Sequence, residues 1–225
     1  MRILAIDTTT NFLTLGIYDK GRTFEYNLKT GRKLSQLLAP TIKRVLCSLG
    51  LVLSDMDYFA AGCGPGSFTG IRLGLSMIKG FSLALNKPVI GESTLDILAM
   101  NSPVTDRKIM PAIDAKRGLV YSCAYKYNNG RLKRVGPYAL IPKDEFIKRI
   151  NSPSVVFGDA LDIYRDDILR KTAKASFPDK DSWYPKAHNL ITLVLQRIAK
   201  GKKTGNFKLN PVYLYPKECQ IKKLK

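Results

Sequence analysis

The order of predicted strands and helices repeats in the two halves of the chain. The first half begins with the residues AID at 5–7, and the same three residues recur at 112–114. In both halves strand-forming segments follow, and a turn between them ends in Gly-Arg, at 21–22 and at 130–131. Three shared residues are weak evidence alone, but the shared order of elements around them indicates a duplication.

Each half reads as βββαβαβα. The first half predicts strands at 2–7, 13–19 and 22–28, a helix at 34–49, a strand at 58–62, a helix over about 70–85, a strand at 88–92 and a short helix from Thr94. Pro40 is expected to kink or locally open its helix. The second half predicts strands from 112–114, at 118–127, at 131–140 and at 154–158, and helices at 142–150, 159–169 and 189–200.

This element order predicts an α/β protein with two ribonuclease-H-like lobes. It is the order found in the ASKHA class, to which sugar kinases, Hsp70 and actin belong. The predicted lobes are residues 1–100 and 101–225. That the two lobes face one another is implied by the resemblance to those families.

The net charge of +19 is unevenly distributed. Residues 1–100 carry +4 and residues 101–225 carry +15. A basic second half indicates contact with nucleic acid or with an acidic partner, and a generally high lysine content of the organism's proteins explains it equally well. The candidate tRNA contacts are Lys202, Lys203, Lys222 and Lys223.

Composition and cysteine spacing favour a soluble cytoplasmic protein. The sequence starts without a basic and apolar leader, and the apolar stretch 71–85 carries Arg72 and Lys79 and is shorter than a bilayer span. The four cysteines form no C-x-x-C pair. Reduced thiols are therefore expected, with no membrane association.

The glycine-rich segment GCGPGSFTGIRLG, at 62–74, precedes a predicted helix. It is not a Walker A loop, because Ile71 stands where the lysine is required. Two interpretations stay open. Ser67 or Thr69 caps a helix whose small residues 70, 74, 80 and 84 let another element approach closely. Alternatively the segment contacts an anion or a residual nucleotide, through Asp7, Thr8, Gly64, Gly66, Ser67 and Thr69.

The motifs of a nucleotide-hydrolysing site are incomplete. The segment DTTTN keeps Asp7 without a glycine, DAKRG keeps Asp114 but adds Lys116 and Arg117, and VVFGDAL retains one glycine. Asp7 and Asp114 are either metal or water ligands or turn residues that cap strand ends. His188 is the single histidine, so no histidine metal site and no independent Ser-His-Asp triad is predicted. We therefore predict no catalytic residue, no metal and no intrinsic cofactor.

Five segments, taken in order, resemble the TsaB family, also called YeaZ, over essentially the whole chain. They are RILAIDTTT, GCGPGSFTGIRLGLSMIKGFSLAL, PVIGESTLDILA, AIDAKRGLVYSCAY and NPVYLYPKECQIKK. The resemblance implies a non-catalytic subunit required to make threonylcarbamoyladenosine beside the anticodon of tRNAs that read codons beginning with A. It also implies that the chain binds and activates the paralogue TsaD and helps recruit the ATPase TsaE. When alone, the chain is expected to form a homodimer. Any bound ATP or ADP is expected at the partner interface.

The resemblance further implies a partner interface on two helices of the first lobe. Its predicted residues are Leu34, Leu37, Leu38, Ile42, Val45, Gly70, Arg72, Gly74, Met77 and Ile78. On this hypothesis, Gly74→Leu breaks the pairing and leaves the lobe folded. The sequence departs from the family where Lys33 and Leu34 replace a frequent histidine.

Two rival functions follow from the same residues. One is an ATP-dependent small-molecule phosphotransferase that uses Asp7 as its catalytic carboxylate. The other is a tRNA-binding module that acts through the basic second half.

Overall fold

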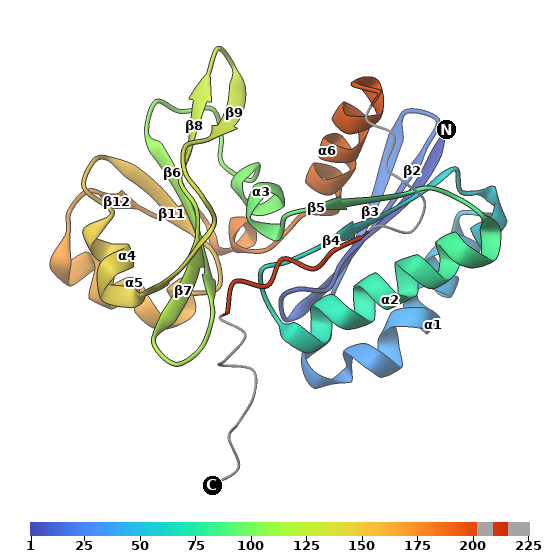
Figure 1. Cartoon of the computed structure of the whole chain (residues 1–225), viewed down its shortest axis with the longest axis horizontal. Coiled ribbons are helices and arrows are strands. Elements are labelled where there is room, and N and C mark those ends of the chain that lie inside the picture. The colour runs from blue at the N-terminus through green and yellow to red at the C-terminus, as the bar shows by residue number, and fades with distance from the viewer. Residues whose placement is uncertain (202–208, 216–225) are drawn as a thin grey trace, which may run out of the picture.

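The first sheet has the strand order β3-β2-β1-β4-β5. In the computed structural model, which describes residues 1–201 and 209–215 (Figure 1), strands β1 (Arg2–Asp7), β2 (Phe12–Asp19) and β3 (Arg22–Lys29) form an antiparallel meander. Strands β4 (Tyr58–Gly62) and β5 (Val89–Glu92) run parallel to β1. The β2–β3 turn has positive φ at both Lys20 and Gly21, as a tight hairpin requires.

Side chains of β1 alternate between two hydrophobic layers. Leu4 and Ile6 pack under helices α1 (Leu34–Ser48) and α2 (Phe68–Leu85). Ile3 and Ala5 pack under a helix on the opposite face, α6 (Ala187–Ala199). Figure 1 shows α1 and α2 on one side of the sheet and α6 on the other.

Helix α1 runs through Pro40 as one element, so the expected opening of the helix does not occur. The proline removes only the N–H that would bond to the carbonyl of Gln36. Both residues are exposed, and water can satisfy that carbonyl.

Helix α2 begins at Phe68, earlier than predicted, and reaches 18 residues. Its length and composition would allow it to cross a membrane, contrary to the expectation from the shorter stretch. The helix instead packs on β4, β1 and β5 through one buried side, formed by Gly70, Ile71, Gly74, Leu75, Ile78 and Ser82.

The second sheet repeats the path of the first, in the order β10-β7-β6-β11-β12, with β8 on β6 and β9 on β8. Its strands are β6 (Lys108–Asp114), β7 (Leu119–Ser122), β8 (Tyr125–Asn128), β9 (Arg131–Arg134), β10 (Ala139–Pro142), β11 (Ser154–Phe157) and β12 (Ala175–Ser176). Strands β7 and β8 keep one register against β6, so the predicted strand 118–127 is interrupted only at Cys123 and Ala124. The predicted two-lobed α/β fold is therefore confirmed.

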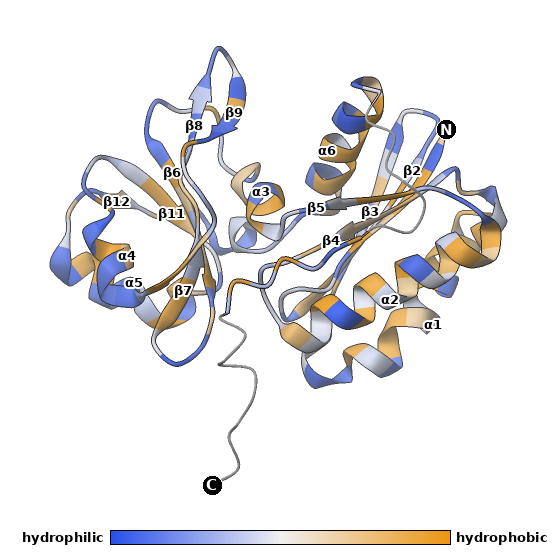
Figure 2. Ribbon diagram, viewed as in Figure 1, coloured by the Kyte–Doolittle hydropathy of each residue, from blue (hydrophilic) through white to orange (hydrophobic). Residues whose placement is uncertain are grey.

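Helices α4 (Lys143–Lys148) and α5 (Leu161–Lys171) pack with the second sheet through its hydrophobic core. Short 3-10 turns lie at Gly31–Lys33, Leu53–Asp55 and Lys180–Trp183. In Figure 2 the hydrophobic segments follow the central strands and the inner helix faces.

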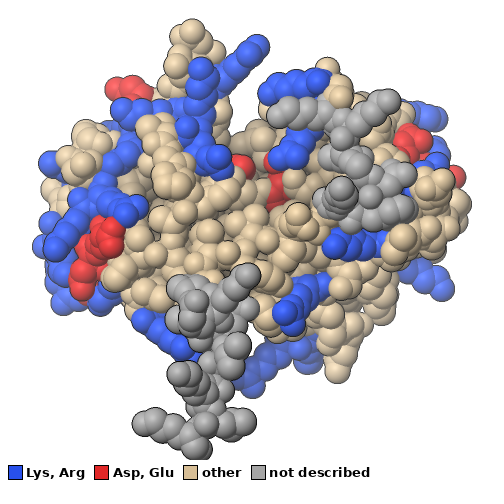
Figure 3. Space-filling view, in the orientation of Figure 1, with Lys and Arg blue, Asp and Glu red and all other residues tan. Residues whose placement is uncertain are grey.

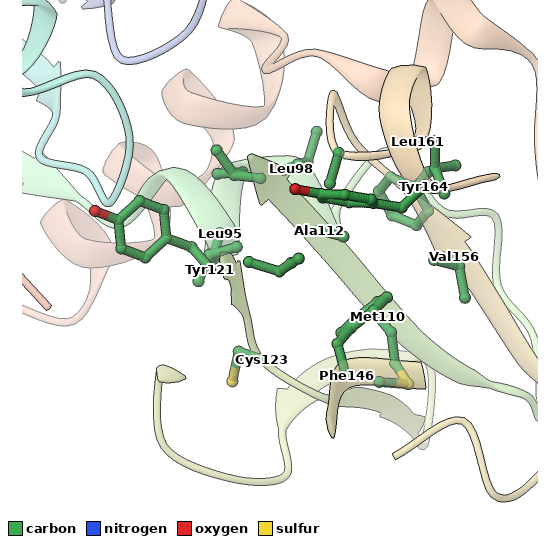
Figure 4. Packing of buried hydrophobic residues seen from close by; sticks show 14 of the residues in the cluster. Leu95, Leu98, Met110, Ala112, Tyr121, Cys123, Phe146, Val156, Leu161 and Tyr164 are labelled. Atoms are coloured by element: carbon green, nitrogen blue, oxygen red, sulfur yellow. The ribbon is translucent and has the colours of Figure 1, made fainter. Parts of the chain in front are cut away.

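The two lobes exchange helices. Helix α3 (Thr94–Ala99) follows the first sheet, but its Leu95 and Leu98 lie in the core of the second lobe, beside Ala112 (Figure 4). Helix α6 follows the second sheet, but it packs on the first. The division at residue 100 therefore follows the sheets and not the helices, since the region 101–225 contains a helix that covers the first lobe.

The N-terminus of α6 is held by β3. Glu25 accepts a hydrogen bond from the Ala187 backbone N–H (2.7 Å) and pairs with Nδ1 of His188 (2.8 Å). Burial disfavours the charged carboxylate, but hydrogen bonds from His188, Ala187 and Asn27 outweigh it and lower the pKa of Glu25. A carboxylate at a helix N-terminus is stabilising.

We predict that Glu25→Gln lowers the free energy of unfolding at pH 7 by about 1 kcal/mol. Because the folded-state pKa of Glu25 is lowered, its contribution is present above the unfolded pKa and disappears as the pH falls through the folded pKa. The free energies of unfolding of wild type and variant should therefore become equal at acidic pH. Urea unfolding at pH 7 and at acidic pH measures both. Glu145→Gln, which removes an exposed pair with Arg149, is the control and should change stability by less than about 0.5 kcal/mol. Equal losses from both variants would contradict the capping role.

Candidate functional site

A cavity of about 570 Å³ lies where the two lobes meet. The first lobe contributes residues 9–11, Gly66 and Ser67 just before α2, and Phe68 and Ile71 in the first turn of α2. The second lobe contributes residues 113–117, Tyr121 and Asp159. The C-terminal segment 212–215 completes the wall.

Asp7 lies at the end of β1 but does not line this cavity. Its side chain is buried. One carboxylate oxygen accepts hydrogen bonds from the backbone N–H (2.8 Å) and the hydroxyl (2.7 Å) of Thr9, and the other accepts one from the Thr94 hydroxyl (3.1 Å). A Cβ on Gly62 would lie 1.9 Å from Oδ2, so the glycine makes room for the carboxyl. Asp7 thus ties the end of β1 to the start of α3 and fills the space beside Gly62 of β4.

Burial raises the pKa of the Asp7 carboxyl, and the hydrogen bonds from Thr9 and Thr94 partly offset that rise. These partners all belong to the chain itself. The geometry corresponds to the turn-residue interpretation of Asp7.

Thr8 fills the space between β1 and α2. Its hydroxyl donates to the Gly70 carbonyl (2.7 Å). A Cβ on Gly70 would lie 2.0 Å from the Thr8 carbonyl oxygen, and one on Gly74 would lie 2.2 Å from the Thr8 hydroxyl. The predicted partner role of Gly70 and Gly74 is therefore wrong, because both face the interior of their own lobe. A leucine at 74 would therefore meet Thr8 inside the lobe before it could reach a partner.

The glycine-rich segment is shaped by its approach to Thr9. The Ser67 N–H donates to the Thr9 carbonyl (2.7 Å), and a Cβ on Gly66 would lie 2.4 Å from that same oxygen. The Ser67 hydroxyl accepts a hydrogen bond from the Gly70 N–H (3.2 Å) and so caps α2. Of the two predicted capping residues, Ser67 and Thr69, the cap is Ser67. The Gly64 carbonyl accepts from the Thr94 N–H (2.8 Å). Of the six predicted anion contacts, only Gly66 and Ser67 line the cavity; Asp7, Thr8, Gly64 and Thr69 do not.

The second lobe presents two carboxylates to the cavity. Asp159 accepts a hydrogen bond from the backbone N–H of Asp114 (2.8 Å). Asp114 accepts from the Lys116 backbone (2.9 Å) and pairs with the Lys116 ammonium (2.5 Å). Burial, with the negative charge of Asp114, raises the pKa of Asp159 to about 6, while the Asp114 N–H and Lys116 act in the opposite sense. Lys116, which the sequence places close to Asp114, thus forms an ion pair with it.

Sequence reasoning did not single out Asp159 as a site residue. The available signal was its place just after β11, the strand beside β6, which ends at Asp114. Gly158 precedes it with φ +127°, and a Cβ there would lie 2.0 Å from the Ala112 carbonyl oxygen. That close approach positions Asp159 beside Asp114.

The segment 209–215 joins the two lobes. Leu209 is buried in the core of the first lobe, and the Val212 N–H donates to the Cys63 carbonyl (2.8 Å). Tyr215 reaches the second lobe, where its hydroxyl donates to the Ala115 carbonyl (2.7 Å) and its ring packs edge-on to Tyr121 (6.1 Å).

Arg72, a predicted partner contact, is engaged at the cavity rim. Its Nε donates to the Tyr213 hydroxyl (3.2 Å), and its guanidinium lies 3.8 Å from the centroid of the Phe68 ring. The Phe68 and Tyr213 rings also contact each other (5.3 Å). Arg72 therefore fastens the C-terminal segment to α2.

The other predicted interface residues divide by burial. Leu34, Leu38, Ile42 and Ile78 are buried in the first lobe. Leu37, Val45 and Met77 are partly exposed, as is Leu73, and Leu83 is 61% exposed. Val45, Leu73 and Met77 also pack against the core of the first lobe. We call the exposed and partly exposed residues of the two helices the α1–α2 face: Leu37, Val45, Leu73, Met77, Gly80 and Leu83.

The four lysines predicted to contact tRNA lie outside the described residues: Lys202, Lys203, Lys222 and Lys223. Within the residues that the structure describes, no group of three or more His, Cys, Asp or Glu side chains is arranged to hold a metal ion. Cys47, Cys63 and Cys123 are free thiols.

The chain is similar to proteins of tRNA modification. The family model for TsaD, a tRNA N6-adenosine threonylcarbamoyltransferase, matches residues 28–168. The tRNA threonylcarbamoyladenosine biosynthesis protein TsaB of Escherichia coli is 29% identical, over 95% of this chain and 94% of that protein. Its counterpart in Buchnera aphidicola from Schizaphis graminum is 30% identical over 89% and 96%. The solved structure of YeaZ from Pseudomonas aeruginosa has a TM-score of 0.81 at 29% identity, covering 95% of this chain and 99% of that one.

The contact between Thr8 and α2 makes two glycines of one helix respond oppositely to alanine. Gly74→Ala should lower the free energy of unfolding by about 1–3 kcal/mol, because the new methyl group overlaps the Thr8 hydroxyl. Gly80→Ala is the matched control: no atom lies within 4 Å of the place its methyl group would take, and it should raise stability by about 0.5–1 kcal/mol. Urea unfolding followed by circular dichroism measures both values. A stabilising Gly74→Ala would show that Thr8 does not fix α2.

Asp159→Asn should stabilise the protein at pH 8 and leave its stability unchanged near pH 4. The folded-state pKa of Asp159 is raised from 3.8 to about 6, so its contribution is present below the unfolded pKa and is lost as the pH rises through about 6. Asparagine keeps the oxygen that accepts from Asp114, so removing the charge should gain about 1–2 kcal/mol at pH 8. Chemical denaturation at both pH values measures the difference. Asp166→Asn, at an exposed position of α5, should stay within about 0.5 kcal/mol at both; a pH-independent effect of Asp159→Asn would contradict the raised pKa.

Proposed function

Because the chain belongs to the TsaB family, we propose that it is the non-catalytic partner of a TsaD-like transferase in threonylcarbamoyladenosine synthesis on tRNA. The α1–α2 face carries this proposal, because it exposes apolar side chains, above all Leu83, on the lobe in which Asp7 is buried and hydrogen-bonded. On this proposal the chain acts in the cytoplasm, a TsaE-like ATPase joins the assembled pair, and any ATP or ADP binds at the partner interface.

The surroundings of Asp7 support a non-catalytic role. A general base or metal ligand must direct a free lone pair at the reactant or ion. Thr9 and Thr94 donate three hydrogen bonds to the two oxygens of Asp7, the side chain is buried, and Asp7 does not line the cavity. The alternative, a phosphotransferase that uses Asp7, requires these bonds to break. It predicts saturable ATP turnover by the isolated chain that Asp7→Asn abolishes.

The α1–α2 face supports a partner of the same fold. Leu83 projects into solvent, and Leu73 and Met77 cover the core only partly. The hydrophobic segments of α1 and α2 are visible in Figure 2. The region matched by the TsaD family model contains both helices, so a TsaD-like protein has equivalent helices to offer. The same face can pair two copies of this chain about a two-fold axis when the partner is absent.

We predict that the double variant Met77→Lys/Leu83→Lys weakens binding to a TsaD-like partner by about 30-fold or more, because it places charge at the centre of an apolar contact. Biolayer interferometry against the TsaD of the same organism measures the affinity, and sedimentation velocity measures self-association. Ile163→Lys/Leu169→Lys is the control, because these residues are 57% and 49% exposed on α5 of the other lobe. Binding that falls equally in both double variants, or in neither, would remove the α1–α2 face from the proposal.

A further inference from the structure

The hairpin formed by β8 and β9 gathers cations on one side. Lys126 stands opposite Lys133, and Asn128 stands opposite Arg131. Opposed residues of an antiparallel pair point to the same face, and so do residues two apart along a strand. All four residues are exposed. Figure 3 shows Lys and Arg atoms along this part of the second lobe.

The neighbouring strand extends this arrangement. The register Ile109↔Tyr125 between β6 and β8 places Lys108 opposite Lys126. Burial and the charge of Lys126 both lower the pKa of Lys108, in agreement with their closeness. Lys108, Lys126 and Lys133 therefore form a row across three adjacent strands, which we call the lysine row.

The like charges of the lysine row lower the stability of the sheet that carries them. Like charges directly opposite one another in an antiparallel pair are destabilising. Within the described residues, neither Lys126, Lys133 nor Arg131 forms an ion pair. Other lysines of the same lobe do: Lys143 with Asp167, Lys171 with Asp144, and Lys180 with Asp162. The charges that compensate the row must therefore come from a ligand or remain those of solvent ions.

We propose that the lysine row, with Arg131, binds the phosphate backbone of the tRNA substrate. Adjacent strands lie about 4.8 Å apart and residues two apart on one strand about 6.8 Å, so the exposed Lys126, Lys133 and Arg131 present a positive surface to several phosphates. The Lys108 ammonium adds its charge beside them while it donates to the Arg149 carbonyl (2.6 Å) and to Oδ1 of Asn151 (2.9 Å). The chemistry favours RNA over an acidic protein, because lysine is depleted in protein–protein interfaces and Lys and Arg supply phosphate contacts to nucleic acids. The inference rests on the proposed function for the identity of the RNA.

The position of the row suits a tRNA held together with a protein partner. The row lies on the second lobe, on β6, β8 and β9, whereas the α1–α2 face lies on the first lobe. A partner on α1 and α2 therefore leaves the row accessible.

Lys126→Glu separates this role from a structural one, because it reverses the charge at the centre of the row. It should raise the melting temperature, since two repulsive cross-strand pairs become attractive, and it should weaken tRNA binding about fivefold or more. The slope of log K against log salt should become shallower by about 1 for each phosphate that the variant no longer neutralises. Lys171→Glu is the matched control with the same charge change: it breaks the pair with Asp144, so it should lower the melting temperature and leave tRNA binding near wild type.

The full chain would be titrated into unmodified tRNA transcript, alone and with the TsaD-like partner, by fluorescence anisotropy at several salt concentrations. Phosphatidylserine vesicles would be titrated in parallel as a second anionic surface. A higher melting temperature with weaker tRNA binding in Lys126→Glu alone supports the proposal. Equal tRNA affinity of the two variants overturns it, as does a Lys126→Glu variant that loses binding only to the vesicles. A wild-type chain that binds tRNA through the row but not the TsaD-like partner would contradict the proposed function and leave the row's role intact.

Discussion

The close contact between the turn after β1 and the start of α2 determines much of the rest of the structure. Thr8 and Thr9 occupy the space that side chains at 66, 70 and 74 would otherwise fill. Asp7 is buried behind them and bonds to Thr94, which starts α3. One cluster thereby fixes the position of α2 against its sheet and the point at which the chain leaves for the second lobe. The outward side of α2 is left to meet other molecules.

This contact holds the Asp7 carboxylate, at the end of the first strand, in hydrogen bonds to its own chain. A catalytic carboxylate must come within hydrogen-bond reach of the reacting group. Here Asp7 bonds to neighbouring threonines, and the cleft carries the pair Asp114–Lys116 and the segment 212–215. The bonds of this segment to both lobes, through Val212 and Tyr215, oppose large movements of one lobe against the other. Among the described residues that line this cleft, the first lobe contributes no carboxylate.

The sequence predicts the sheets well because their signals are local. The apolar run of β1 and the turn at 20–21 are both recognisable from neighbouring residues, so they locate the strands. Local signals could not predict which part of the molecule the glycine side of α2 packs against. Helical spacing groups Gly70 with Gly74, but only the fold brings Thr8, 62 residues away, against them. The exchange of α3 and α6 and the place of Asp159 likewise depend on long-range packing. The lysine row becomes visible only when the register of β6, β8 and β9 is known.

The most direct test of the account is a reconstitution of threonylcarbamoyl transfer to unmodified tRNA by TsaD and its companions, with and without this chain. Nucleoside mass spectrometry quantifies the modified adenosine, and ATP hydrolysis by the isolated chain is measured in parallel. If the chain is a non-catalytic subunit, modification depends on it, and the chain alone hydrolyses no ATP. Modification that proceeds equally well without the chain, or vigorous hydrolysis that Asp7→Asn abolishes, would contradict it.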